Sequence, residues 1–161
     1  MKKSEENAYS TKFKDLTELK NFIGKELGLT SWMQMSQKKI DDFAEITDDK
    51  QWIHTDPDKS ALYSPYKKTV AHGFLVLSMV SRISFNAFSI KNVVAGINYG
   101  LDRVRFPNAT KFDSAYRGRV SLMEFTVIPG GAKYKLKIVI EIQGEEKPAC
   151  VAESLGLAYT K

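Results

Sequence analysis

Residues 73–88 read GFLVLSMVSRISFNAF and form the longest apolar run of the chain. Apolar side chains recur at so many of these positions that they cover most of the circumference of a helix. At about 1.5 Å per residue the helix would span roughly 24 Å, and we expect protein to surround it on nearly all sides. Arg82 interrupts the run before it reaches the ~18 uncharged residues that a membrane span requires.

The period of the pattern changes after this run. Apolar and polar side chains alternate over residues 134–142, which predicts a half-buried strand. Similar patterns predict strands over 93–105, 119–128 and 149–159, the first with a bulge where its apolar phase shifts. One apolar helix followed by long antiparallel strands indicates an α+β fold in which the sheet wraps the helix.

Shorter elements are predicted before residue 73. Residues 1–13 are polar and charged, so we expect a flexible tail there and one domain over residues 14–161. Ser36 is a good helix N-cap, and Asp56 is another. The apolar spacing and these caps predict a helical turn within 15–25, a strand over 27–35, a helix over 37–46 and a helix ending at Tyr63.

Composition limits the classes of partner. The chain has 161 residues and a hydrophobic fraction of 43%, as in an ordinary soluble domain. Its net charge of +5 suits nucleic acid, a membrane surface or an anionic metabolite such as a nucleotide or coenzyme A, and does not choose between them. Its positive charges are scattered among acids, so we expect no nucleic-acid or membrane partner. Cys150 is the only cysteine, which fits a reducing cytoplasm, and its apolar neighbours predict a buried structural thiol.

The two histidines of the chain lie in two short strings, residues 47–54 and residues 71–74, and the second string opens the apolar run. In the first string Asp49 precedes His54 by five residues, just past the helix predicted over 37–46. A carboxylate and a neutral imidazole brought together can hold one water molecule, with one partner acting as base and the other as acid. The alternative is a structural or surface pair, which these two residues alone favour.

His72 and Gly73 lie in the second string, where the apolar helix begins. Free backbone N–H groups and the positive end of the helix dipole favour a developing negative oxygen there, and glycine permits close approach. Losing one donor of this kind typically costs ~10²–10³ in rate. The alternative, favoured on the dipeptide alone, is that Gly73 permits tight packing and His72 caps a loop.

Three stretches carry a family resemblance when they are taken together. They are residues 43–56 (FAEITDDKQWIHTD), 71–75 (AHGFL) and 98–107 (NYGLDRVRFP). They resemble the MaoC-like, R-specific enoyl-CoA hydratases, whose pattern is Ser/Thr-Gly-Asp, any residue, Asn-Pro, an aliphatic residue and His. Asp48 stands at the glycine of that pattern, and Gln51-Trp52 in place of Asn-Pro is similar to the branch related to nodulation protein N.

This resemblance implies a hotdog fold around residues 73–88, a homodimer with active sites near the subunit interface, and an acyl thioester of coenzyme A or a carrier protein as substrate. It also implies Asp49 and His54 as the catalytic pair and the backbone N–H of Gly73 as the oxyanion donor, without a metal or redox cofactor. We expect further substrate contacts from Gln51, His72, Arg103 and Arg105. The two arginines would meet the phosphates of coenzyme A.

Three functions remain open on these grounds. The first is an R-specific enoyl-CoA hydratase, which adds water to a trans-2-enoyl thioester or removes it from a 3-hydroxyacyl thioester in fatty acid metabolism. The second is a hotdog thioesterase, but such enzymes commonly supply a carboxylate from the long helix, and residues 73–88 contain no Asp or Glu. The third is a non-catalytic module for acyl binding or dimerisation.

Overall fold

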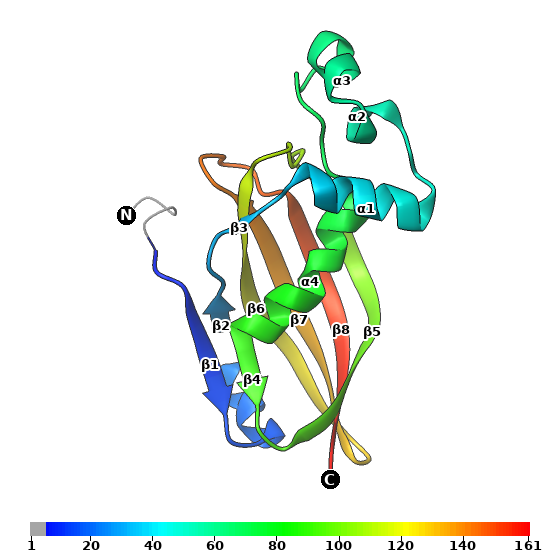
Figure 1. Ribbon diagram of the computed structural model, residues 1–161. Coiled ribbons are helices and arrows are strands. Elements are labelled where there is room, and N and C mark those ends of the chain that lie inside the picture. Colours follow the sequence, from blue (N-terminus) through cyan, green and yellow to red (C-terminus); the bar gives the residue numbers. More distant parts are fainter. Residues whose placement is uncertain (1–5) are drawn as a thin grey trace.

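The computed structural model describes residues 6–161 and contains a long, mostly antiparallel sheet with one helix across its face (Figure 1). The strands run in the order β4-β1-β2-β6-β7-β8-β5, and the short β3 pairs with β6. Their bounds are β1 Tyr9–Phe13, β2 Glu26–Leu29, β3 Met33–Gln34, β4 Phe88–Ile90, β5 Val93–Arg105, β6 Ala115–Ile128, β7 Gly131–Ile142 and β8 Cys150–Thr160. The predicted hotdog arrangement, a sheet wrapped around one helix, is confirmed.

Helix α4 (Gly73–Ala87) is the helix at the centre of this arrangement. Gly118 of β6 lets it approach the sheet closely, because a Cβ at that position would lie 2.2 Å from Ile83 Cγ2. The buried side chains of α4 join the core and are Leu75, Val76, Val80, Ile83 and Ala87. The expectation that protein surrounds α4 is wrong for the single chain, where Phe74 is 73% exposed and Phe85 is 83% exposed.

Three further α-helices of the described residues lie at the N-terminal end of α4 (Figure 1). Ser36 caps α1 (Gln37–Thr47) by accepting the N–H of Lys39, as its sequence position predicts. The helices α2 (Trp52–Thr55) and α3 (Pro57–Tyr63) follow, and the Asp56 side chain caps α3. Of these, only α2 has no counterpart among the elements predicted from the sequence.

The strand predicted over residues 27–35 is divided into β2 and β3. The division falls at Thr30, whose N–H donates to the carbonyl of Gly118 while its hydroxyl accepts the N–H of Gly118. A side chain therefore takes the place of one backbone partner, and the regular ladder stops there.

The flexible tail predicted over residues 1–13 is wrong for residues 9–13, because Tyr9–Phe13 forms strand β1. This strand pairs antiparallel with β2 and parallel with β4, and Phe13 is buried in the core. Glu6 also forms an ion pair with Arg119 of β6 at 2.6 Å. Residues 1–5, the rest of the predicted tail, lie outside the described residues. The alternation in this segment is weak, so long-range pairing decides its structure.

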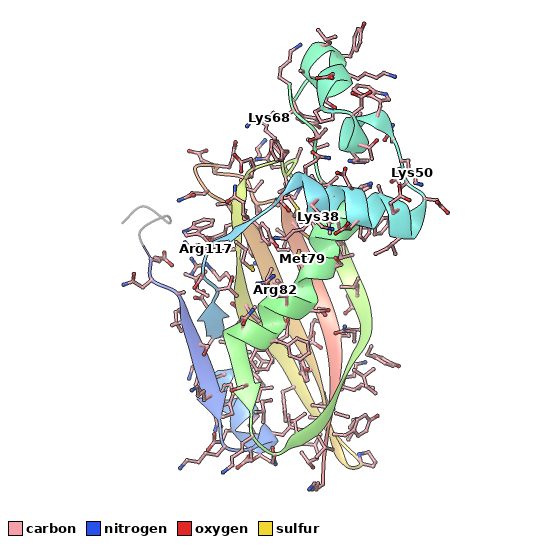
Figure 2. All side chains as sticks on the ribbon, in the orientation of Figure 1. Lys38, Lys50, Lys68, Met79, Arg82 and Arg117 are labelled. Carbon is pink, nitrogen blue, oxygen red and sulfur yellow. The ribbon has the colours of Figure 1, made fainter. Side chains whose placement is uncertain are left out.

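Two other features agree with the sequence. The predicted bulge in β5 is present, since the register against β8 shifts between Leu101 and Arg103. Cys150 is fully buried, and burial raises the pKa of its thiol to about 11. No helix within residues 6–161 is long and apolar enough to cross a membrane. Figure 2 shows the side chains in the same orientation, with Arg82 and Met79 on α4.

Candidate active site

The end of helix α1 places Asp49 through a tight turn. Asp48 follows the last helical residue with φ 57° and ψ 13°, in the left-handed region. Glycine adopts this conformation readily, and aspartate is one of the few other residues that tolerate it. The next backbone bond of the turn joins the N–H of Lys50 to the carbonyl of Asp48 at 3.0 Å. The turn at Asp48 therefore has the backbone shape that a glycine there would favour.

Helix α2 holds His54 in one orientation. His54 is 7% exposed, and its Nδ1 lies 2.6 Å from the carbonyl oxygen of Val70. A carbonyl only accepts, so Nδ1 carries the proton and Nε2 of the neutral ring keeps a free lone pair. The neighbouring backbone supports this contact, because the N–H of Val70 donates to Ile53 and Gln37 Nε2 donates to the carbonyl of His54.

Burial lowers the pKa of His54 below its ordinary value. The hydrogen bond with Val70 and the Asp49 carboxylate oppose this shift, whereas His72 adds to it. Desolvation is the largest contribution because the charged imidazolium loses its water contacts at this position. The ring is therefore neutral at neutral pH, in the state that accepts a proton.

His72 packs directly against His54. The two ring centroids are 3.8 Å apart with an interplanar angle of 27°, and the ring of Phe43 lies 5.1 Å from His72. His72 is 3% exposed, and its Nε2 donates to the backbone carbonyl of Asp49 at 2.9 Å. The residue that precedes α4 therefore contacts both the acid and the imidazole found by sequence spacing.

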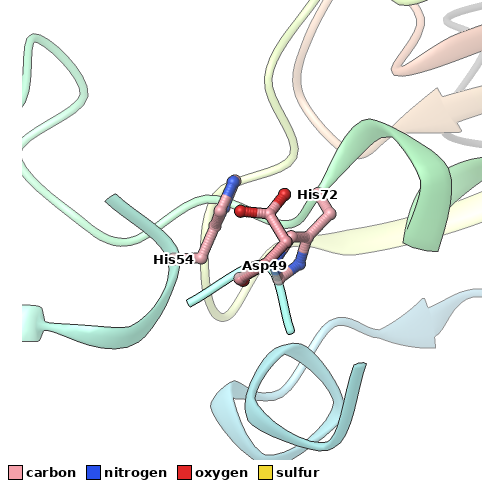
Figure 3. Close-up of side chains that lie close together, drawn as sticks. All are labelled: Asp49, His54 and His72. Atoms are coloured by element: carbon pink, nitrogen blue, oxygen red, sulfur yellow. The ribbon is translucent and has the colours of Figure 1, made fainter. Parts of the chain in front are cut away.

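These contacts bring Asp49, His54 and His72 together at one place (Figure 3). One nitrogen or carboxylate oxygen of each residue lies within 4.8 Å of those of the other two. Asp49 is exposed while both rings are buried, so the carboxylate marks the open side of the cluster. An acceptor imidazole beside a solvent-accessible carboxylate can bind a water molecule and exchange protons with it.

The same three residues also match the donor types of a zinc site. An imidazole ligates a metal with a ring-nitrogen lone pair that lies in the plane of the ring. Because the rings of His54 and His72 are stacked, their planes run nearly side by side and do not meet at a common ion. Nε2 of His72 is also occupied by its bond to Asp49. The arrangement favours proton transfer over metal binding.

Gly73 is the first residue of α4 and directly follows the cluster. The first N–H groups of a helix have no partner within the helix, and the macrodipole makes this end attractive to negative charge. The side chain of His72, the N-cap residue of α4, makes no capping hydrogen bond. A Cβ on Gly73 would lie 3.2 Å from the ring of Phe106, so any larger residue would displace that ring.

The other expected contacts lie around the cluster. Gln51 is exposed, and its backbone carbonyl accepts the N–H of His54 at 2.9 Å. Arg103 and Arg105 are exposed on β5, and Arg105 bonds to the carbonyl of Val104. The side chain of His72, which was predicted to contact the substrate, is buried in the protein and does not face solvent.

Sequence reasoning missed three neighbours of the pair: the carbonyl of Val70, the ring of Phe43 and the ring of Phe106. The Val70 contact is made by backbone, which any residue type supplies. Phe43 has the spacing of a core residue on α1, and Phe106 follows a strand 33 residues after Gly73. Both phenylalanines lie inside stretches that carry the family resemblance, but no spacing rule assigns their rings to the site.

A separate cavity of about 390 Å³ lies along the C-terminal half of α4. Its walls come from α4, β4, β5, β7 and β8, and they are mainly apolar. They include Ser84, Phe85, Ile97, Leu136, Ser154 and Gly156. Ser84 stands 11 residues after Gly73, which corresponds to roughly 17 Å along the helix axis.

The sequence of this chain is similar to a known protein family and to characterised relatives. Residues 18–139 match the model of the MaoC like domain. The chain is 35% identical over 144 residues to 3-hydroxyacyl-thioester dehydratase Z of Mycobacterium tuberculosis, covering 89% of this chain and 95% of that protein. It is 40% identical over 141 residues to nodulation protein N of Rhizobium leguminosarum bv. viciae, covering 85% and 86%.

Solved structures share the fold at low sequence identity. The R-hydratase PhaJ1 of Pseudomonas aeruginosa superposes with a TM-score of 0.70 at 17% identity, covering 86% of this chain and 83% of that one. The monoamine oxidase regulatory protein of Archaeoglobus fulgius gives 0.73 at 20% identity, covering 93% and 97%. With a family model over most of its length and relatives above 30% identity, this chain belongs to the MaoC-like domain family.

Proposed function

We propose that the protein is a hydratase or dehydratase that interconverts 2-enoyl and 3-hydroxyacyl thioesters, as an R-specific enoyl-CoA hydratase does. The observation that carries the proposal is the meeting of the Asp49 carboxylate and His54, with Nε2 free, beside the N-terminus of α4. The names of the relatives agree with the reaction class.

In the hydration direction, Asp49 and Nε2 of His54 hold one water molecule. As the water oxygen bonds to C3, one water proton passes to this pair and the π electrons of the C2=C3 bond move onto the thioester oxygen. The pair then returns one proton to C2, so that the product carries the whole water molecule. Dehydration is the reverse of these steps.

The N-terminus of α4 stabilises the thioester oxygen on which negative charge develops. The enolate oxygen accepts the N–H of Gly73, which points outward from the first turn of the helix. Such a donor stabilises the transition state more than the ground state because charge grows on the oxygen as the reaction proceeds. The positive end of the α4 dipole acts in the same direction.

The acyl chain and the thioester carrier use different surfaces. The apolar cavity beside the C-terminal half of α4 suits the distal carbons of a long acyl chain. The exposed cations Arg103 and Arg105 lie on β5, which leads to Phe106 next to Gly73. They suit the phosphates of coenzyme A or of a carrier protein, together with the exposed Lys67.

A homodimer would cover the apolar surface that a single chain leaves open. Strand β5 is an edge of the sheet, and several of its side chains are exposed although they are apolar, as is Phe74 of α4. They include Tyr99 at 58% and Leu101 at 45%. An exposed edge with an apolar surface is a typical pairing site, so we propose that two copies join along β5 and α4.

The test follows the loss of conjugated enoyl thioester by ultraviolet absorbance, with crotonyl-CoA and longer 2-enoyl-CoA esters as substrates. Hydration at a rate above buffer, abolished by Asp49→Asn and by His54→Ala, supports the proposal. Asp42→Asn is the control, because Asp42 is an exposed carboxylate paired with Lys38 on α1. Equal inactivity of the wild type and both variants towards every chain length contradicts the proposal, and release of free thiol would indicate a thioesterase.

A further inference from the structure

The most connected side chain of the cluster has no part in the chemistry proposed above. We propose that His72 is a positioning residue that locks the Asp49 turn and the His54 ring into one arrangement through a hydrogen bond and a ring stack. The inference rests on the proposed hydratase function for its kinetic consequences, and on geometry alone for its structural ones.

The hydrogen bond tethers a turn that is otherwise loosely held. Asp49 lies in an exposed segment after α1, and its own N–H has only a long contact of 3.5 Å with Thr47 Oγ1. Nε2 of His72 donates to the Asp49 carbonyl at 2.9 Å, across 23 residues of chain. This bond ties the residue before α4 directly to the backbone that carries the carboxylate.

The ring of His72 holds the second partner. It stacks on His54 at 3.8 Å, and it contacts Phe43 at 5.1 Å with a tilt of 49°. His54 is already fixed at one nitrogen by Val70. A stacked neighbour restricts the remaining tilt of the ring, so that Nε2 stays aimed at the space beside Asp49.

The two histidines hold their protons on opposite nitrogens. His54 donates from Nδ1 to Val70, whereas His72 donates from Nε2 to Asp49. Nδ1 of His72 is buried without a hydrogen-bond partner among the described residues. His72 therefore directs its one ring N–H to the backbone that carries the Asp49 carboxylate.

Two variants separate the hydrogen bond from the stack. His72→Phe keeps an aromatic ring and removes the donor, and His72→Gln keeps a donor and removes the ring. We expect each to lower kcat by roughly 10- to 100-fold, since small displacements of catalytic groups have effects of this size, while KM stays within about twofold. Phe43→Leu is the packing control, since it loosens the packing against the His72 ring but removes neither the hydrogen bond to Asp49 nor the stack on His54.

A kcat equal to that of the wild type in both His72 variants would overturn the proposal. So would a fall in kcat no larger than that of Phe43→Leu at matched stability, measured by urea unfolding, because the role would then be packing only. The comparison uses folded protein in each case, checked by circular dichroism.

Nuclear magnetic resonance tests the geometry independently of activity. The chain has only two histidines, so its imidazole ¹⁵N spectrum contains two residues, and His72→Phe assigns them. We expect the Nδ1–H tautomer for His54 and the Nε2–H tautomer for His72. Finding His72 protonated on Nδ1 overturns the inference. An inactive wild type with the expected tautomers, and with His54 signals that broaden in His72→Phe, would reject the proposed function and support the positioning role.

Discussion

Nδ1 of His54 lies 2.6 Å from the carbonyl oxygen of Val70, and this single contact decides which ring nitrogen is available for chemistry. Because a backbone carbonyl cannot donate, the proton stays on Nδ1 and the lone pair on Nε2. Val70 lies two residues before His72 and three before Gly73. The base, its stacked neighbour and the helix end are thus positioned by one short segment.

Removing either member of the pair should abolish hydration. We expect Asp49→Asn and His54→Ala each to lower kcat for crotonyl-CoA by about 10²–10⁴, the range for a general acid or base. KM should change little, because neither group binds the acyl chain. Steady-state kinetics measure both constants, and a loss confined to KM would assign the two residues to binding.

The pH profile should follow His54. Burial lowers the pKa of this ring, so the neutral form that accepts a proton persists below the ordinary value of about 6.5. The acid limb of kcat/KM should therefore have its midpoint below that value. A midpoint above 6.5 would mean that another group limits the rate or that the ring is stabilised in its charged form.

The two neighbours of His54 should shift its pKa in opposite directions. The Asp49 carboxylate raises the pKa of His54, so Asp49→Asn should lower it further. His72 lowers it, so His72→Phe should raise it. Titration of the imidazole Hε1 signal gives both values without a substrate. Shifts of the same sign would be inconsistent with the arrangement described.

Asp48 should respond to substitution according to backbone conformation. Its φ of 57° is a position where glycine has no steric penalty and most other residues do. We expect Asp48→Val to destabilise the protein by about 1–2 kcal/mol relative to Asp48→Gly. Urea unfolding at constant m-value measures the difference. Equal stability of the two variants would show that the turn adopts another conformation.

Filling the distal cavity should restrict acyl chain length. Ser84→Trp places a large ring among the cavity walls, so kcat/KM for long 2-enoyl thioesters should fall about tenfold or more while crotonyl-CoA is unaffected. Asn86→Trp is the control, since Asn86 is exposed on the same helix and is not part of those walls. An equal loss for short and long chains would exclude the cavity as the acyl site.

Charge on the β5 surface should weaken a dimer. Leu101→Lys introduces a cation into the proposed interface, and we expect the dimer dissociation constant to rise by at least about tenfold. Val127→Lys is the matched control, because Val127 is 72% exposed on β6 and outside that interface. Light scattering across a dilution series measures the mass. A wild type that is monomeric at every concentration contradicts the proposal.

The sequence was sufficient for features with a local period. Residues 73–88 predict α4 to within one residue at its end, and the alternation over residues 134–142 predicts most of β7. Both patterns arise from one-sided burial, which repeats every few residues. The family resemblance, and not the spacing alone, implied the pair of Asp49 and His54, whose side chains lie close together in the structure.

Contacts between distant segments could not be predicted in this way. The bond from Val70 to His54 uses a carbonyl, and the bond from His72 to Asp49 crosses 23 residues. Neither leaves a mark on side-chain pattern or composition. The sequence places His72 beside Gly73, but only the folded chain shows that its ring turns back towards the preceding turn and away from the helix end.

Strand β1 lies among the first described residues, and its pairing limits how far the chain can be shortened. It supplies the pairing partner for one side of β2 and also for β4, the direct continuation of α4. A shortened protein that begins at Lys14 would leave both strands with open backbone groups and remove Phe13 from the core. The unpaired strand edges of such a truncated protein would promote aggregation. A shortened chain for crystallisation should therefore retain Glu6 and the residues after it.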